Sequence, residues 1–95
     1  MWVLTGKSMK SIFHNNTRYA VIGSGSWATA LIKILQDTHD EVLWYVRDQH
    51  MIDFIRENNH NPQYLQAATL DPSRLKMSFD INRTIRDADV LIFCI

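Results

Sequence analysis

The sequence has little of several features that would restrict its class. Cys94 is its only cysteine, so no disulfide forms within the chain, and we interpret it as a small buried apolar residue. Ten basic and ten acidic residues give a net charge of zero, which favours neither nucleic acid nor an anionic membrane as partner. The longest apolar run, "VLIFCI", is far shorter than the roughly 20 residues of a membrane-spanning helix, and the N-terminus lacks the apolar core of a secretory signal. We therefore expect a soluble, cytoplasmic protein with one small domain.

Strand-like and helix-like patterns alternate from residue 18 onward. Short runs rich in β-branched and apolar residues predict strands at 18–23, 41–46, 75–79 and 88–95. Between them lie amphipathic stretches, the second and third of which follow the potential capping residues Asp48 and Asp80. This β-α-β-α-β-α-β order predicts an α/β fold with a parallel sheet. Right-handed crossovers then give the strand order 3-2-1-4, the first half of a Rossmann-type doubly wound sheet.

The two ends of the chain lead to further expectations. Residues 1–17 show no clear period, and we interpret them as an N-terminal extension or loose arm, with disorder as one alternative. The sequence stops inside the apolar strand 88–95, so we expect residues 18–95 to be an incomplete domain from a longer protein. In the order 3-2-1-4 this last strand would be an exposed edge, which predicts self-association and a homo-oligomer.

Three small residues, Gly23, Gly25 and Ala28, form the pattern G-x-G-x-x-A between the first strand and the first helix. Gly23 would let the chain turn sharply, Gly25 would let a pyrophosphate approach the backbone, and Ala28 would let the helix pack closely on the sheet. The phosphates would lie at the helix N-terminus, where free N–H groups and the positive end of the helix dipole meet them. This position between strand and helix predicts a dinucleotide-binding turn; the alternative is a glycine turn without a ligand.

The remaining residues of the turn, Ser24, Ser26 and Trp27, would line the same site, with Ser26 as a hydroxyl donor. The window 43–46 contains no acidic residue to hold the ribose 2′-hydroxyl of NAD, and Arg47 follows it. A guanidinium there could pair with the 2′-phosphate of NADP or stack on adenine, which tilts the prediction toward NADP over NAD. The alternative is that Arg47 is only a solvated surface residue.

Other patterns predict no chemistry. The four histidines show no metal-ligand spacing, and no nucleophile motif is visible around a serine or the cysteine. Trp44 lies in the middle of a predicted strand and is expected in the core. We therefore assign neither a metal site nor a catalytic residue.

Four segments follow one another along the chain: "VIGSGSWATAL", "HDEVLWYVRD", "NPQYL" and "DINRTIRDADVLIFCI". The most specific parts are Ser26 and Trp27, directly after the two glycines, and "LWYVRD". From about Tyr19 to the last residue, this series resembles the N-terminal part of bacterial NAD(P)-dependent glycerol-3-phosphate dehydrogenase. The resemblance implies NADP or NAD as cofactor and the reduction of dihydroxyacetone phosphate to sn-glycerol 3-phosphate, a phospholipid precursor.

The resemblance also implies roles for particular residues. Ser26 and Trp27 would contact the cofactor phosphates, Arg47 the adenosine ribose or its phosphate, and Tyr64 would lie near the cofactor. From its sequence context alone, Tyr64 is a loop aromatic packed over the sheet. The catalytic lysine and the substrate contacts of the family would lie beyond residue 95, so the chain by itself is expected to have no reductase activity.

Three other functions stay open at this point. One is a reductase of the wider hydroxyacid or ketopantoate type, which would share the cofactor turn but act on another substrate. Another is a non-catalytic Rossmann module that senses nucleotides, which the short chain favours. The last is a protein-interaction domain without any ligand, which is supported only by the net charge of zero.

Overall fold

The computed structural model describes residues 2–5 and 17–95. In chain order, the elements are strand β1 (Trp2–Thr5), strand β2 (Tyr19–Ile22), helix α2 (Ser26–Thr38), strand β3 (Val42–Tyr45), helix α3 (Gln49–Asn58), the 3-10 turn η1 (Pro72–Arg74), strand β4 (Leu75–Ser78), helix α4 (Ile81–Asp87) and strand β5 (Val90–Phe93). The predicted alternation from residue 18 onward is therefore confirmed.

Two aspartates start the helices that the sequence assigned to them. The Asp48 carboxylate accepts a hydrogen bond from the His50 amide at the start of α3 (2.9 Å), and Asp80 accepts from the Asn82 amide at the start of α4 (3.0 Å). Each bond satisfies an amide that has no partner within its own helix. Helix α3 ends where Asn59 adopts the left-handed conformation (φ 64°), which asparagine tolerates better than most residues.

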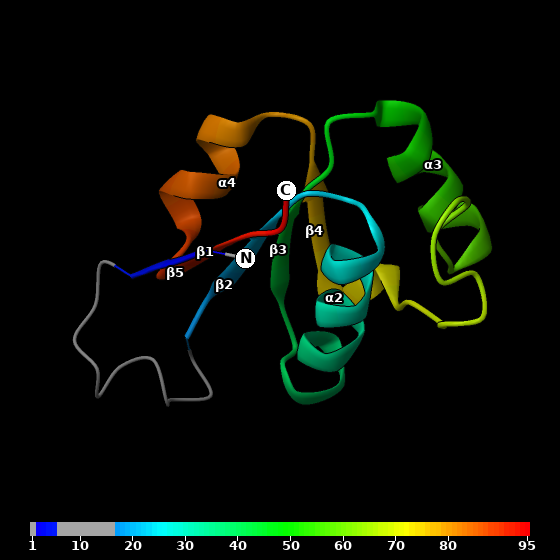
Figure 1. Ribbon diagram of the computed structural model, residues 1–95, viewed down its shortest axis with the longest axis horizontal. Helices are drawn as coiled ribbons and strands as arrows, with labels where there is room; N and C mark the ends of the chain where they lie inside the picture. Colours follow the sequence, from blue (N-terminus) through cyan, green and yellow to red (C-terminus); the bar gives the residue numbers. More distant parts are fainter. Residues whose placement is uncertain (1, 6–16) are drawn as a thin grey trace.

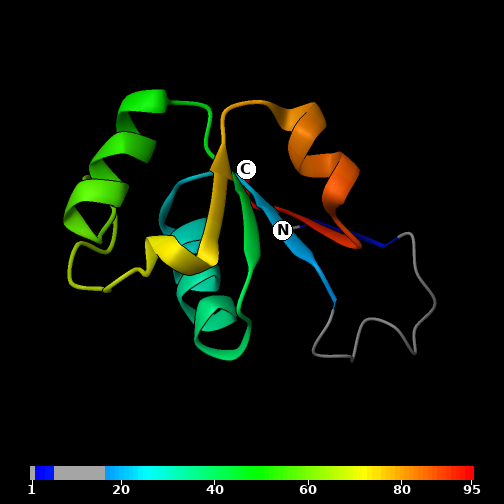
Figure 2. The same ribbon diagram turned by 180° about the vertical axis from the view of Figure 1, so that it is seen from behind.

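The five strands form one sheet in the order β1-β5-β2-β3-β4. The four strands β2 to β5 run parallel in the predicted order 3-2-1-4, and their carboxyl ends share one edge of the sheet. Figures 1 and 2 show α2 and α3 on one side of the sheet and α4 on the other. This arrangement follows from right-handed crossovers, because the chain moves outward over α2 and α3 and returns over α4.

The outermost strand β1 contradicts the expectation for the start of the chain. Trp2 to Thr5 pair antiparallel with β5, in a register that runs from Trp2 opposite Phe93 to Thr5 opposite Val90. This part of the stretch 1–17 is therefore a strand and no loose arm; residue 1 and residues 6–16 lie outside the described residues. The prediction that the last strand forms an exposed edge is wrong, because β1 covers that edge.

One hydrophobic core fills the space between the sheet and helices α2 and α3. Trp44 of β3, Ile32 of α2 and Ile52 of α3 each have an exposed fraction of 1% or less. In the described part of the chain, every buried polar side-chain atom has a hydrogen-bond partner. No helix in this part is long and apolar enough to cross a membrane.

Candidate functional site

The turn after β2 brings two backbone segments unusually close together. The Cys94 amide donates a hydrogen bond to the Ile22 carbonyl (2.8 Å), which extends the pairing of β5 with β2 up to the turn. Gly23 has φ 128°, and a Cβ atom there would lie 2.2 Å from the Cys94 carbonyl oxygen. Glycine is therefore required at this position both by the backbone conformation and by the approach of the segment after β5.

Gly25 leaves the N-terminus of α2 open. It is the N-cap residue of this 13-residue helix, its backbone is extended (φ −79°, ψ −164°), and no side chain caps the first turn. A Cβ atom at Gly25 would meet nothing within 4 Å. No N-cap side chain thus occupies the first-turn amides of the helix, and uncapped helix N-termini are places where proteins bind phosphate groups. The residues present fit the pyrophosphate of a dinucleotide.

Beside this helix end lies a cavity of about 540 Å³, lined by Gly25, Ser26, Trp27, Cys94 and Ile95. The Trp27 side chain is 80% exposed and forms an apolar wall of the cavity. Cys94, interpreted from the sequence as a small buried apolar residue, is partly buried and packs against the hydrophobic core. This burial raises the pKa of its thiol. The cavity is therefore shaped by two segments that lie far apart in the sequence, the glycine turn and the residues that follow β5.

Arg47 and Tyr64 lie outside this cavity. Arg47 is exposed just beyond β3, and the Gly23 amide donates to the Tyr45 carbonyl (3.3 Å), so Arg47 follows a strand end that touches the glycine turn. Tyr64 is 40% exposed in the loop after α3. Its backbone amide donates to the side chain of Asn61 (3.1 Å), whose Nδ2 in turn donates to the Ser24 carbonyl (3.1 Å). The loop with Tyr64 is therefore tied to the glycine turn.

Sequence reasoning missed three side chains that hold this turn. Trp44 was expected only in the core, but its indole Nε1 also donates to the Gly23 carbonyl (2.6 Å). Asn61 and Thr29, both with an exposed fraction of 0%, bond to the turn as well. Asn61 stands in the polar stretch "ENNHNP", which reads as an ordinary helix end, so no signal in the sequence singled it out.

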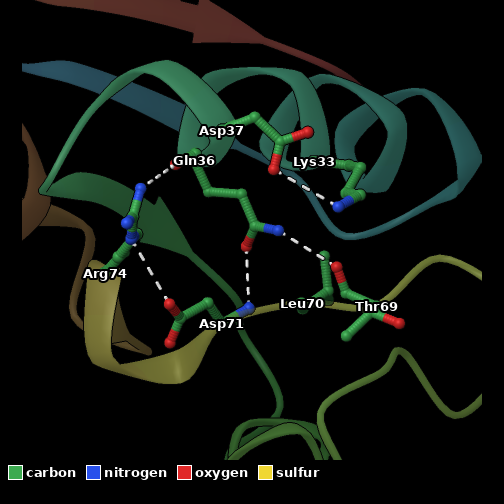
Figure 3. A pocket seen from close by; sticks show the side chains of 7 residues that line it. All are labelled: Lys33, Gln36, Asp37, Thr69, Leu70, Asp71 and Arg74. Atoms are coloured by element: carbon green, nitrogen blue, oxygen red, sulfur yellow. Dashed lines mark hydrogen bonds and ion pairs between the residues drawn. The ribbon is translucent and has the colours of Figure 1, made fainter.

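A second cavity, of about 430 Å³, lies near the C-terminal end of α2. Figure 3 shows that its polar side chains pair with the protein itself. The nearly buried Gln36 side chain donates to the Thr69 carbonyl (3.0 Å) and accepts from the Asp71 amide (2.8 Å), while Arg74 donates to the Gln36 carbonyl (2.9 Å). These bonds fasten the loop before β4 to the helix. Because the polar groups of Gln36 and Arg74 already bond to the protein, the residues around this cavity fit a structural role better than a binding role.

The parallel sheet, the glycine turn at its carboxyl edge and the open helix N-terminus together define a dinucleotide-binding α/β domain of the Rossmann type. A family model described as "NAD-dependent glycerol-3-phosphate dehydrogenase N-terminus" matches residues 18–95. The chain belongs to this family.

Similar sequences support this family assignment. "Glycerol-3-phosphate dehydrogenase [NAD(P)+]" of Streptococcus uberis is 30% identical over 81 residues, which are 85% of this chain and 24% of that protein. The protein of the same name from Corynebacterium aurimucosum is 35% identical over 74 residues (78% of this chain, 22% of that protein). The crystal structure of glycerol-3-phosphate dehydrogenase from Coxiella burnetii superposes with a TM-score of 0.66 at 23% identity, covering 79% of this chain and 23% of that one, and supports the fold. The chain spans about a quarter of the length of these relatives.

Proposed function

We propose that residues 18–95 bind the adenosine and pyrophosphate part of NADP or NAD. The observation that carries this proposal is the uncapped first turn of α2, which follows two glycines and opens on the cavity beside Trp27. Ser24 and Ser26 lie in the turn and supply further donors. When bound, the cofactor would supply the hydride for a reduction; the residues of this chain bind and orient it.

We further propose that the domain serves a cytoplasmic glycerol-3-phosphate dehydrogenase that reduces dihydroxyacetone phosphate to sn-glycerol 3-phosphate. The family assignment supports this substrate over the wider hydroxyacid and ketopantoate reductases. The chain covers only about a quarter of its named relatives, so residues that act on the substrate are not assigned. A homo-oligomer and the absence of nucleic-acid and membrane partners stay predictions.

Calorimetric titration of the purified 95-residue chain with NADPH and with NADH tests cofactor binding. We expect weak but saturable binding, because half of a doubly wound sheet supplies the pyrophosphate contacts but not the whole cofactor site. In the same preparation we expect no oxidation of NADPH by dihydroxyacetone phosphate. Absence of any binding heat at millimolar cofactor would contradict the first proposal, and measurable turnover would contradict the expected lack of activity.

Arg47→Ala tests the preference for NADP. If the guanidinium pairs with the 2′-phosphate, NADPH should bind about 10- to 100-fold more weakly, because a charge-assisted hydrogen bond contributes about 1.5–3 kcal/mol. NADH, which lacks this phosphate, should lose at most about twofold, within the range of a surface substitution.

Arg56→Ala is the matched control for this experiment. Arg56 is also an exposed arginine, but it lies on α3 and does not line the cavity beside Gly25 and Trp27. It should leave the affinity for both cofactors unchanged. An equal loss of NADPH and NADH affinity in Arg47→Ala would contradict the pairing of the Arg47 guanidinium with the 2′-phosphate.

A further inference from the structure

Three consecutive carbonyl groups of the glycine turn each accept a hydrogen bond from a different side chain. Trp44 Nε1 donates to the Gly23 carbonyl (2.6 Å), Asn61 Nδ2 to the Ser24 carbonyl (3.1 Å), and Thr29 Oγ1 to the Gly25 carbonyl (2.8 Å). The donors come from β3, from the loop after α3, and from α2. Side chains from three parts of the fold thus hold one short segment.

The three donors, Trp44, Asn61 and Thr29, are fully buried, each with an exposed fraction of 0%. Asn61 Nδ2 also donates to Thr29 Oγ1 (2.9 Å), so two of the donors are joined. The other amide atom of Asn61, Oδ1, accepts from the backbone amides of Gln63 (2.9 Å) and Tyr64 (3.1 Å). Buried networks whose members all have partners hold a single arrangement, because any displacement leaves a polar group unpaired away from water.

These bonds decide where the amides of the turn point. A trans peptide is planar, so its N–H points opposite to its C=O, and the described residues contain no cis peptide. A carbonyl held by a buried donor therefore turns the next amide away from that donor. The amides of Ser24, Gly25 and Ser26 follow the three held carbonyls, and Gly25 and Ser26 line the open cavity. Oriented consecutive amides are what an anion-binding turn requires.

We propose that Trp44, Asn61 and Thr29 are positioning residues for the pyrophosphate: they hold the carbonyls of the turn on the protein side and so direct its amides toward the phosphates. This inference rests on the proposed binding of a dinucleotide. The three side chains touch the turn and not the cofactor. Asn61 additionally fixes the backbone at Tyr64 relative to the same turn.

The pair Thr29→Val and Thr29→Ser gives the sharpest test. Valine keeps the shape of threonine without the hydroxyl, while serine keeps the hydroxyl without the methyl group. We expect the 95-residue chain with Thr29→Val to bind ADP about tenfold more weakly. The Gly25 carbonyl keeps its bond from the Thr29 backbone amide (3.0 Å), but the carbonyl loses its side-chain donor and Asn61 Nδ2 loses the hydroxyl to which it donates (2.9 Å). Binding of adenosine, followed by NMR titration, should stay within about twofold, since adenosine has no phosphate. Thr29→Ser should restore ADP binding.

A purely structural role would have another signature. Thr29→Val would then lower the melting temperature while changing ADP and adenosine affinity by the same factor, or changing neither. Either result would overturn the inference. Trp44→Phe, which removes the Nε1 donor and keeps an aromatic ring in the core, should show the same selective loss for ADP.

A nucleotide-free measurement separates this inference from the proposed function. Relaxation of ¹⁵N nuclei should give rigid amides at Ser24, Gly25 and Ser26 in the unsubstituted chain, with order parameters near about 0.85, and values below about 0.6 in Thr29→Val. If the unsubstituted chain binds no ADP, the proposed function fails, and these order parameters still decide the inference. Unchanged order parameters in Thr29→Val and Trp44→Phe would overturn it.

Discussion

Gly23→Ala is expected to destabilise the chain by about 2–5 kcal/mol, the sum of a positive-φ penalty and the cost of overpacking. The new Cβ would lie 2.2 Å from the Cys94 carbonyl oxygen, and the position has φ 128°. The atom it meets belongs to the backbone, so no flexible side chain can move out of the way. Relief requires that the segment after β5 separates from β2, which breaks the bond between the Cys94 amide and the Ile22 carbonyl.

This loss is a large part of the total stability. A chain of 95 residues has about 5–14 kcal/mol between its folded and unfolded states, at about 0.05–0.15 kcal/mol per residue. Urea unfolding followed by circular dichroism measures the change directly. We expect Gly23→Ala to unfold at much lower urea concentration, or to be largely unfolded at 25 °C.

Gly25→Ala is the matched control, because it adds the same atom two residues later. Its backbone is extended, a conformation open to any residue, and the added Cβ meets nothing within 4 Å. Stability should therefore change by no more than about 0.5 kcal/mol. Affinity for ADP should nevertheless fall, because the methyl group would occupy the approach to the first-turn amides. If both substitutions destabilise the chain equally, the separate roles assigned to the two glycines are wrong.

The second large effect is expected at the β1 edge of the sheet. Amides of Val90 and Cys94 donate to carbonyls on the β2 side, so in β5 the alternating amides of Leu91 and Phe93 face β1. Leu4 lies opposite Leu91 in the register. Along an antiparallel pair of strands, hydrogen-bonded and non-hydrogen-bonded pairs of opposed residues alternate. In a hydrogen-bonded pair, the backbone amide and carbonyl of each residue face the partner strand; in the other kind they point away from it. The Leu4 amide therefore faces β5, and the neighbouring Val3 amide faces away.

Leu4→Pro should release β1, because proline removes the amide that faces β5 and places its ring there. The outer edge of β5 would then present unpaired backbone groups, and an open edge invites pairing with another chain. We expect Leu4→Pro to form dimers and larger species in sedimentation velocity experiments. Val3→Pro changes an amide that faces away from β5 and should sediment like the unsubstituted chain at the same concentration. A monomeric Leu4→Pro would show that β1 does not protect this edge.

Much of the fold could be predicted because its signals are local. The start of α3 follows from Asp48, whose carboxylate reaches an amide two residues away. The start of α4 follows in the same way from Asp80. The strand order 3-2-1-4 follows from the alternation of strands and helices together with the handedness of crossovers. Strand β1 escaped prediction because its partner β5 lies almost the whole chain length away, and four residues are too few to show a period.

The candidate site divides in the same way. Gly23, Gly25 and Ala28 could be recognised by their spacing, because a tight turn from a strand into a helix requires small residues at positions close together in the sequence. The buried role of Asn61 could not, since nothing near it in the sequence distinguishes it from a loop asparagine. The roles of Arg47 and Tyr64 in binding stay predictions, because their side chains lie outside the cavity beside α2.

By itself, the sequence determined the alternation of elements, the helix caps and the glycine turn, because each depends on residues that are close to one another in the sequence. Only the tertiary structure decided that Gly23 must clear the Cys94 carbonyl, that β1 closes the sheet, and that buried donors hold the turn. The indole of Trp44 and the amide of Asn61 reach carbonyls 21 and 37 residues away in the chain. Such contacts arise when packing brings distant segments together, and no local preference encodes them.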